Sequence, residues 1–323
     1  MPFTSFHFLF KDSFQVKFKL TVLLVLVLFV SFEDPNMGGE AAQDDVPLAY
    51  DVGAPDEKYK LPSSLEEISG LSYYKKDKLA CVQDEKGNIY ILNLEKGKIT
   101  KKYDFGDDGD YEDIAVVGKM VYILKNNGNI YRIKDFKKKD PKVKKYNTPL
   151  KEKNDCEGMT YDPRTDALLI ACKGSPSIDK DQPYEGYKAI YKFDLEEKEL
   201  EKDPIYLIDL ERLDNYKDRS AFAKLSVRIA KRLRLMESET SFEPSGIAIH
   251  PGTGEIYIIS SVGKLLIILD RGGKVLDVKE LDPELFRQPE GICFSPEGDM
   301  YISNEGQGKK GYVLKFKPQK RRE

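Results

Sequence analysis

The chain has 323 residues, of which 33% are charged and 40% are hydrophobic, and its formal net charge is −3. This balance is typical of a soluble domain and argues against general binding to nucleic acid, which needs a basic surface. The internal repeat described below places most of this length in one domain.

Residues 1–35 are predicted to be a signal peptide or an N-terminal membrane anchor. A basic segment (KDSFQVKFK) precedes Leu20–Phe32, which is almost wholly apolar and carries no charge. A run of this length is typical of a signal-peptide core and is short for a spanning helix. No small-x-small cleavage site follows, so an uncleaved anchor, lengthened by the apolar residues between the lysines, is the alternative. Both alternatives predict export, and the acidic residues 36–57 are interpreted as a flexible spacer.

A short phrase recurs along residues 58–317. Each copy has a glutamate, one or two small or polar residues and then an apolar strand, and two further strand-like runs follow, such as MVYILKNN and GNIYRIKDF. The glutamates are spaced by 45, 45, 86 and 47 residues: Glu67, Glu112, Glu157, Glu243 and Glu290. A repeat of about 45 residues with three or four strands per unit is typical of the blades of a β-propeller.

The interval of 86 residues between Glu157 and Glu243 decides between five and six blades. It holds no further glutamate phrase, but its residues 214–240 carry apolar side chains at helical spacing. These are Phe222, Leu225, Ile229, Leu233 and Met236. We therefore predict an all-β fold, a five-bladed β-propeller with one helical insertion at 214–240, and six blades are the alternative. Lys58–Leu61 is predicted to supply the outer strand of the last blade and so to close the ring.

The insertion is strongly basic. Between Lys217 and Arg234 it carries seven Lys or Arg residues against one Asp. We favour packing of its apolar face on the propeller, with the charges in solvent. The alternative is that this helix lies on an anionic membrane surface.

The sequence contains no recognisable catalytic constellation. The two histidines are His7 in the leader and His250 in a turn, and neither a Ser-His-Asp set nor a Gly-rich phosphate loop is present. The four cysteines show no CxxC spacing, so they are interpreted as buried apolar residues rather than as metal ligands. Cys156 and Cys172 belong to neighbouring strands of one blade, and a disulfide between them is the one pairing considered.

The repeat glutamates suggest a polar axis. The first strand of each propeller blade lines the channel, so these glutamates are expected to form a ring. Crowded carboxylates either rise in pKa or attract cations, and calcium prefers several oxygen ligands in flexible geometry. The predicted metal ligands are Asp110, Glu112 and Glu290, and the predicted ligand-binding residues are Glu67, Glu157, Glu243 and Asn304. The alternative is that the glutamates accept backbone N–H groups of the next blade.

Taken in order, the phrases EEISGLSY, DYEDIAVV, CEGMTYDP, EPSGIAIHP and PEGICFSPEGDMYISNEG resemble the SdiA-regulated (YjiK-like) family of bacterial envelope proteins. The likeness covers about Lys58 to Phe316. It implies a β-propeller behind an N-terminal hydrophobic segment, at the periplasmic side of the bacterial inner membrane or secreted, and it suggests calcium binding. Asp110 and Glu112 match an Asp-x-Glu of the second repeat, whereas the basic insertion departs from the family.

Two functions follow as expectations. The first is a non-catalytic, calcium-binding envelope module that recognises an unidentified ligand or partner and is held at the membrane by its N-terminal segment. The second is a metal-dependent hydrolase of phosphoesters or lactones. It rests on a distant likeness to phytase-like and lactonase-like propellers, for which Glu290 and Asn304 would be the relevant residues.

Overall fold

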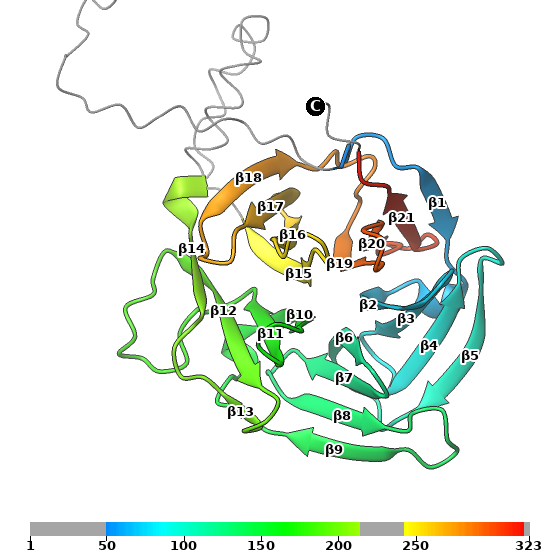
Figure 1. Cartoon of the computed structure of the whole chain (residues 1–323), viewed down its shortest axis with the longest axis horizontal. Coiled ribbons are helices and arrows are strands. Elements are labelled where there is room, and N and C mark those ends of the chain that lie inside the picture. Colours follow the sequence, from blue (N-terminus) through cyan, green and yellow to red (C-terminus); the bar gives the residue numbers. More distant parts are fainter. Residues whose placement is uncertain (1–49, 214–241, 320–323) are drawn as a thin grey trace, which may run out of the picture. The chain divides into compact units, whose positions relative to one another are not determined.

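The computed structural model describes residues 50–213 and 242–319. Within them, five antiparallel sheets surround a central channel as the blades of a propeller (Figure 1). The predicted all-β, five-bladed fold is therefore confirmed. A helix begins at Leu210 and is described as far as Leu213. The whole of the predicted insertion (214–240), the predicted leader and most of the spacer lie outside the described residues.

The blades follow one another along the chain, and each runs from an inner strand at the channel to an outer strand. Blade 1 comprises β2 (Ile68–Lys75), β3 (Lys78–Gln83), β4 (Asn88–Asn93) and β5 (Lys98–Asp104). Blade 2 comprises β6 (Tyr111–Val117), β7 (Met120–Lys125), β8 (Ile130–Lys134) and β9 (Lys142–Tyr146). Blade 3 comprises β10 (Cys156–Asp162), β11 (Ala167–Cys172) and β12 (Tyr187–Asp194), with β13 (Glu199–Leu200) and β14 (Tyr206–Asp209) both paired to β12.

Blades 4 and 5 complete the ring. Blade 4 comprises β15 (Glu243–Ile249), β16 (Ile256–Val262), β17 (Leu265–Leu269) and β18 (Val275–Glu280). Blade 5 comprises β19 (Pro289–Phe294), β20 (Met300–Asn304), β21 (Tyr312–Phe316) and β1 (Glu57–Lys60). Two short 3-10 helices, η1 (Ser63–Leu65) and η2 (Glu152–Asn154), precede the inner strands of blades 1 and 3. No helix of the described residues has the length and hydropathy of a membrane span.

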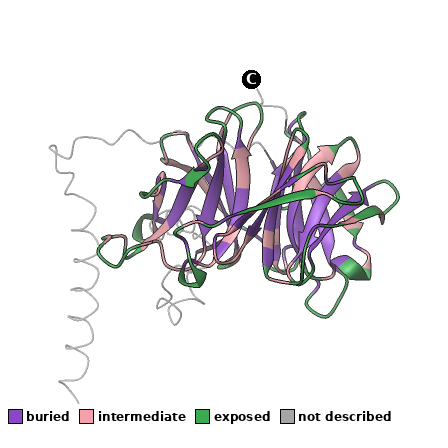
Figure 2. Ribbon diagram, turned by 90° about the horizontal axis from the view of Figure 1, so that it is seen from below, coloured by how far each residue is buried: buried purple, intermediate pink, exposed green. Residues whose placement is uncertain are grey.

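The core consists of five apolar clusters, one between each pair of neighbouring blades. In β3, Leu79 and Cys81 pack towards blade 5, whereas Ala80 and Val82 pack towards blade 2. Successive side chains of a strand point to opposite faces, so each blade buries one set against each neighbour. This explains why the middle strands are apolar at nearly every position, and Figure 2 shows buried residues along the strands and exposed ones in the loops.

All four cysteines are buried, as predicted, and all four are free. Cys156 and Cys172 are directly opposite each other on β10 and β11, and their Sγ atoms lie 3.9 Å apart.

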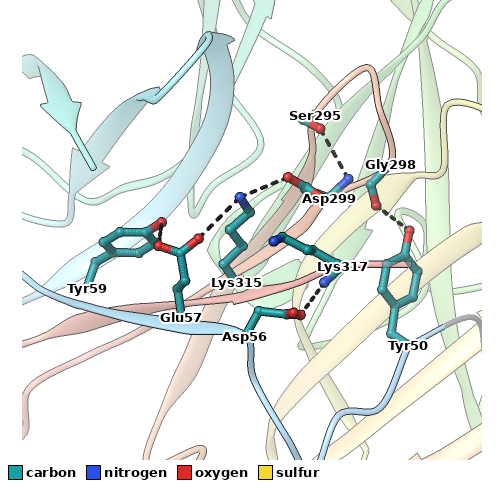
Figure 3. A network of polar contacts seen from close by, with 9 residues as sticks. All are labelled: Tyr50, Asp56, Glu57, Tyr59, Ser295, Gly298, Asp299, Lys315 and Lys317. Carbon is teal, nitrogen blue, oxygen red and sulfur yellow. Dashed lines mark hydrogen bonds and ion pairs between the residues drawn. The ribbon is translucent and has the colours of Figure 1, made fainter. Parts of the chain in front are cut away.

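The ring is closed by β1, which pairs with β21 over four residues, as predicted for this segment. Side chains reinforce the closure (Figure 3). Lys315 on β21 forms ion pairs with Asp299, at 3.0 Å, and with Glu57 on β1, at 3.5 Å. The hydroxyl of Tyr59 donates a hydrogen bond to Glu57, and this bond is the main reason why the pKa of Glu57 is lowered. The Tyr50 hydroxyl donates to the carbonyl of Gly298 and ties the preceding segment to blade 5.

Candidate functional site

Each inner strand carries a β-bulge where it enters the channel. In blade 2 the register between β6 and β7 shifts between Tyr111 and Asp113, and in blade 3 the shift lies between Cys156 and Gly158. The residue omitted from the ladder is the one in between, a repeat glutamate in both blades. A bulge bends its strand and re-aims the side chain of the extra residue. The bulges therefore turn these glutamates out of the regular sheet.

Comparable register shifts occur in the other three blades. The equivalent bulge residues are Ser69, Glu112, Glu157, Ser245 and Glu290. The glutamates are thus equivalent in blades 2, 3 and 5 only. In blades 1 and 4 the bulge residue is a serine, and the repeat glutamate lies two positions earlier. The uniform offset expected from the sequence does not hold, because the glutamate precedes the bulge residue by two positions in these blades and occupies it in the other three.

All five bulge residues line one cavity of about 260 Å³, which we call the acidic cavity. Its lining also includes residues that directly follow the second strands of blades 1, 2, 3 and 5: Asp84, Asn126, Lys173 and Glu305. The cavity holds seven carboxylate side chains: Glu67, Asp84, Asp110, Glu112, Glu157, Glu290 and Glu305. One lysine, Lys173, is the only basic residue in this lining among the described residues.

Five of the seven residues predicted to bind metal or ligand line the acidic cavity: Glu67, Asp110, Glu112, Glu157 and Glu290. Glu243 and Asn304 are not part of the lining. The amide of Glu243 donates to the Ser260 hydroxyl at 2.9 Å, at the start of blade 4. Asn304 is fully buried at the end of β20, and its side-chain amide has no hydrogen-bond partner within residues 50–213 and 242–319.

The electrostatics of the acidic cavity are dominated by burial of like charges. Burial raises the pKa of Glu112 from its ordinary 4.5 to about 9, and the nearby carboxylates of Glu157 and Asp155 add to the shift. Burial and the Glu157 carboxylate likewise raise the pKa of Glu290 to about 8. The Asp84 carboxylate is the main cause of the raised pKa of Glu67. Without a cation, the cavity therefore keeps protons on its buried glutamates at neutral pH.

Lys173 neutralises part of this charge. Its Nζ lies 3.0 Å from Oε1 of Glu157, and both side chains are largely buried. Burial lowers the pKa of Lys173, but the Glu157 carboxylate outweighs burial and the net shift is upward. This ion pair leaves the side chains of Glu112 and Glu290 without a basic partner of their own in the cavity lining.

A constriction closes the acidic cavity towards the middle of the channel. The residue after each bulge is glycine in four blades and Asp113 in blade 2. A Cβ added to Gly291 would lie 2.8 Å from the Ser69 carbonyl oxygen, and one added to Gly246 would lie 2.7 Å from that of Glu290. The inner strands approach so closely here that only glycine fits at these positions.

Asp113 fills the corresponding place between blades 1, 2 and 3. Its carboxylate is buried and accepts hydrogen bonds from the amides of Ile114, at 2.8 Å, and Met159, at 2.7 Å. Burial raises the pKa of this carboxyl well above its usual range, against the effect of both hydrogen bonds. The side chain locks blade 2 to blade 3. This is the role considered as the alternative for the repeat glutamates, and here it is performed by the neighbouring aspartate.

The donor set of the acidic cavity suits a hard cation. It consists of carboxylate, amide and hydroxyl oxygens, without thiolate or imidazole, and such ligands are typical of calcium and magnesium sites. In residues 50–213 and 242–319, no three acidic, histidine or cysteine side chains are arranged as a preformed metal site. Binding of an ion would therefore require the flexible glutamate side chains to converge.

Comparison with known proteins gives one family match. The model of the SdiA-regulated family matches residues 54–307. Comparison with curated proteins found no match.

The similar solved structures include a luciferin-regenerating enzyme, with 11% identity, a TM-score of 0.47 and coverage of 81% of this chain and 95% of that one. A glutaminyl cyclase from Myxococcus xanthus has 12% identity, a TM-score of 0.48 and coverage of 82% and 95%. A PQQ-bound aldose sugar dehydrogenase from Streptomyces coelicolor has 13% identity, a TM-score of 0.46 and coverage of 82% and 100%.

Proposed function

The chain belongs to the SdiA-regulated family, and from this premise we propose that it is an exported, non-catalytic propeller that binds calcium in the acidic cavity. One observation carries the proposal: seven carboxylates line a cavity that contains one lysine, within the described part of the chain. Two of these glutamates have pKa values of about 8 and 9, so their charge is strongly disfavoured without a cation. A divalent ion would release their protons and neutralise the charge that remains.

Calcium suits this cavity better than magnesium. Calcium accepts six to eight oxygen ligands in flexible geometry, whereas magnesium requires a near-ideal octahedron. The glutamates Glu112, Glu157 and Glu290 come from three different blades. An ion held by them would join these blades at the axis, and it would present a charged site to a ligand or partner at this end of the channel.

Thermal unfolding in calcium and in chelator tests the proposal. Calcium at 100 times its Kd should stabilise the folded propeller by about 2.7 kcal/mol, because it binds only the folded state. This corresponds to a rise in Tm of about 5 to 10 °C for a domain of this size. The variant E112Q/E290Q should lose the response and remain folded. E95Q/E196Q, which replaces two exposed glutamates on outer parts of blades 1 and 3, is the matched control.

Two results would overturn the calcium site. The first is an identical Tm of the wild-type protein in calcium and in chelator. The second is an equal calcium response in E112Q/E290Q and in the control. Generic ester, lactone and phosphomonoester substrates test the alternative of an enzyme. Turnover that depends on calcium and is lost in E290Q would show that the protein is an enzyme and not a binding module.

Export is supported by the apolar run Leu20–Phe32 behind a basic segment. Residues 1–57 fused to alkaline phosphatase, which is active only after export from a bacterial cytoplasm, should give activity, and residues 36–57 in the same fusion should not. Equal activity of the two fusions would refute export. The N-terminal residue of the mature protein would then distinguish a cleaved signal peptide from a retained anchor.

A further inference from the structure

A second cavity of about 610 Å³ lies at the opposite ends of the same inner strands. Each inner strand begins at the acidic cavity, passes the constriction and contributes its next residues to this second cavity, which we call the apolar funnel. In blade 5, Glu290 lines the first and Ile292 to Phe294 line the second. The corresponding funnel residues of the other blades are 71–73, 114–116, 159–161 and 247–249.

The two ends of the channel differ in chemistry. The funnel lining contains no carboxylate among the described residues, and its cationic side chains are Arg164 and Arg271. Its other titratable groups are His250, Tyr73, Tyr161 and Cys293. Its walls are formed mainly by aliphatic and aromatic side chains, several of which are partly exposed, including Val116, Ile249 and Phe294. A volume of this size is typical of sites for small organic molecules. Its chemistry is therefore apolar with a basic edge.

The arginines supply positive charge at one side of the funnel. The Nη1 atom of Arg271 lies 2.8 Å from Asp162, and the buried Nε atom of Arg271 has no hydrogen-bond partner within residues 50–213 and 242–319. An unpaired buried donor is costly, and an incoming acceptor would remove that cost. The exposed side chain of Arg164 has no ion-pair partner in the described part of the chain. Arg164 therefore adds a positive charge that is not held in an ion pair within the described part of the chain.

His250 adds a neutral polar group to an aromatic wall. Its ring lies 5.1 Å from that of Phe294 and 6.1 Å from that of Tyr50, measured between centroids. Burial lowers the pKa of His250, and its Nδ1 accepts a hydrogen bond from the Thr253 amide at 3.0 Å. The ring is consequently neutral at pH 7, with its proton on Nε2.

We propose that the apolar funnel binds a small organic anion, a molecule with an aliphatic or aromatic body and one carboxylate or sulfonate group. The body contacts the walls formed by the inner strands, and the anionic group lies at the edge formed by Arg164 and Arg271. The constriction separates this ligand from the acidic cavity. The funnel is therefore a site independent of calcium, and it rests on different residues from those of the proposed function.

A matched pair of fluorescent probes tests the site. The probes are 8-anilino-1-naphthalenesulfonate, which is anionic, and N-phenyl-1-naphthylamine, which has a similar apolar body without the charge. The anionic probe should bind the folded wild-type protein saturably, with one molecule per chain, and more tightly than the neutral probe. R164Q should weaken binding of the anionic probe about two- to fivefold, the range for one exposed ion pair, and should leave binding of the neutral probe unchanged.

Two variants complete the test. T160W places a bulky side chain in the funnel and should weaken both probes, whereas R212Q replaces an exposed arginine outside the funnel and should weaken neither. E112Q/E290Q should bind both probes as the wild type does, with or without calcium, which separates this site from the acidic cavity. Unchanged binding of the anionic probe to both R164Q and T160W, each with wild-type Tm, would overturn the proposal. If T160W does not fold, the comparison of R164Q with R212Q decides.

Discussion

Raising the pH of the calcium-free protein should destabilise it, because the two glutamates with the most strongly raised pKa values, Glu112 and Glu290, lose their protons. The folded pKa values of Glu112 and Glu290 are about 9 and 8, above the ordinary 4.5 that applies to the unfolded chain. Between pH 4.5 and pH 8 the folded state therefore holds protons that the unfolded state has released. Stability falls with rising pH wherever the folded state binds more protons. The contribution of these groups is complete below pH 4.5 and is lost by about pH 9.

The expected size follows from the proton count. One proton retained only in the folded state changes the free energy of unfolding by about 1.4 kcal/mol per pH unit. Glu112 and Glu290 interact with each other and with Glu157, so the three titrate together and one retained proton is the conservative count. From pH 5.5 to pH 7.5 this amounts to about 3 kcal/mol, or about 6 to 12 °C in Tm. Two retained protons would double it.

The assay compares thermal unfolding of three proteins in chelator at half-unit steps of pH. Wild type and the control E95Q/E196Q should lose stability as the pH rises, and E112Q/E290Q should vary much less and be the most stable at pH 8. Protonation of His250, whose lowered pKa acts in the opposite direction below pH 6.5, is common to all three and cancels in the differences. If the difference between E112Q/E290Q and wild type is the same at pH 5.5 and at pH 8, the reasoning is refuted.

Three further predictions concern the ring itself, each measured as the free energy of unfolding in urea. D113A should lose about 2 kcal/mol, because two buried backbone amides lose their acceptor; a loss below 0.5 kcal/mol would show that water replaces it. G291A should lose about 1 to 3 kcal/mol, because its Cβ would lie 2.8 Å from backbone and side-chain oxygens, whereas G106A, whose Cβ would meet no atom nearer than 3.8 Å, should lose less; equal losses would contradict the constriction. K315M should lose about 1 to 2 kcal/mol, because Asp299 is left partly buried without its partner, and unchanged stability would show that the closing ion pairs contribute nothing.

The sequence was sufficient for the architecture because propeller geometry is periodic in the chain. A spacing near 45 residues identified the blades, and strands that are apolar at nearly every position matched burial between two neighbours. The closing segment was also readable, since a short strand-like segment without a partner preceded the first repeat. The predicted insertion at 214–240 remains a prediction, as do export and calcium binding.

The acidic cavity was only partly predictable, because its geometry depends on register. A bulge is a relation between two strands, so the equivalence of Ser69 and Ser245 with the glutamates could not be seen in either strand alone. The residues that directly follow the second strands, such as Asp84 and Lys173, were not predicted to line the cavity. Their sequence signal is that they recur with about the same period as the glutamates. Asn304, the last residue of β20, is fully buried and is not part of the cavity lining, and burial of this polar residue could not be read from its strand alone.

The closure by β1 has a consequence for how the protein reaches its folded state. β1 pairs with β21, so Lys60 meets Tyr312 across almost the whole propeller sequence. Contacts between such distant positions slow folding, because the chain must lose the entropy of a long loop before they form. During folding, β1 cannot pair until β21 is in place, and until then the β20 edge of blade 5 is free to pair with another chain. Slow placement of β21 should therefore favour aggregation of the partly folded chain.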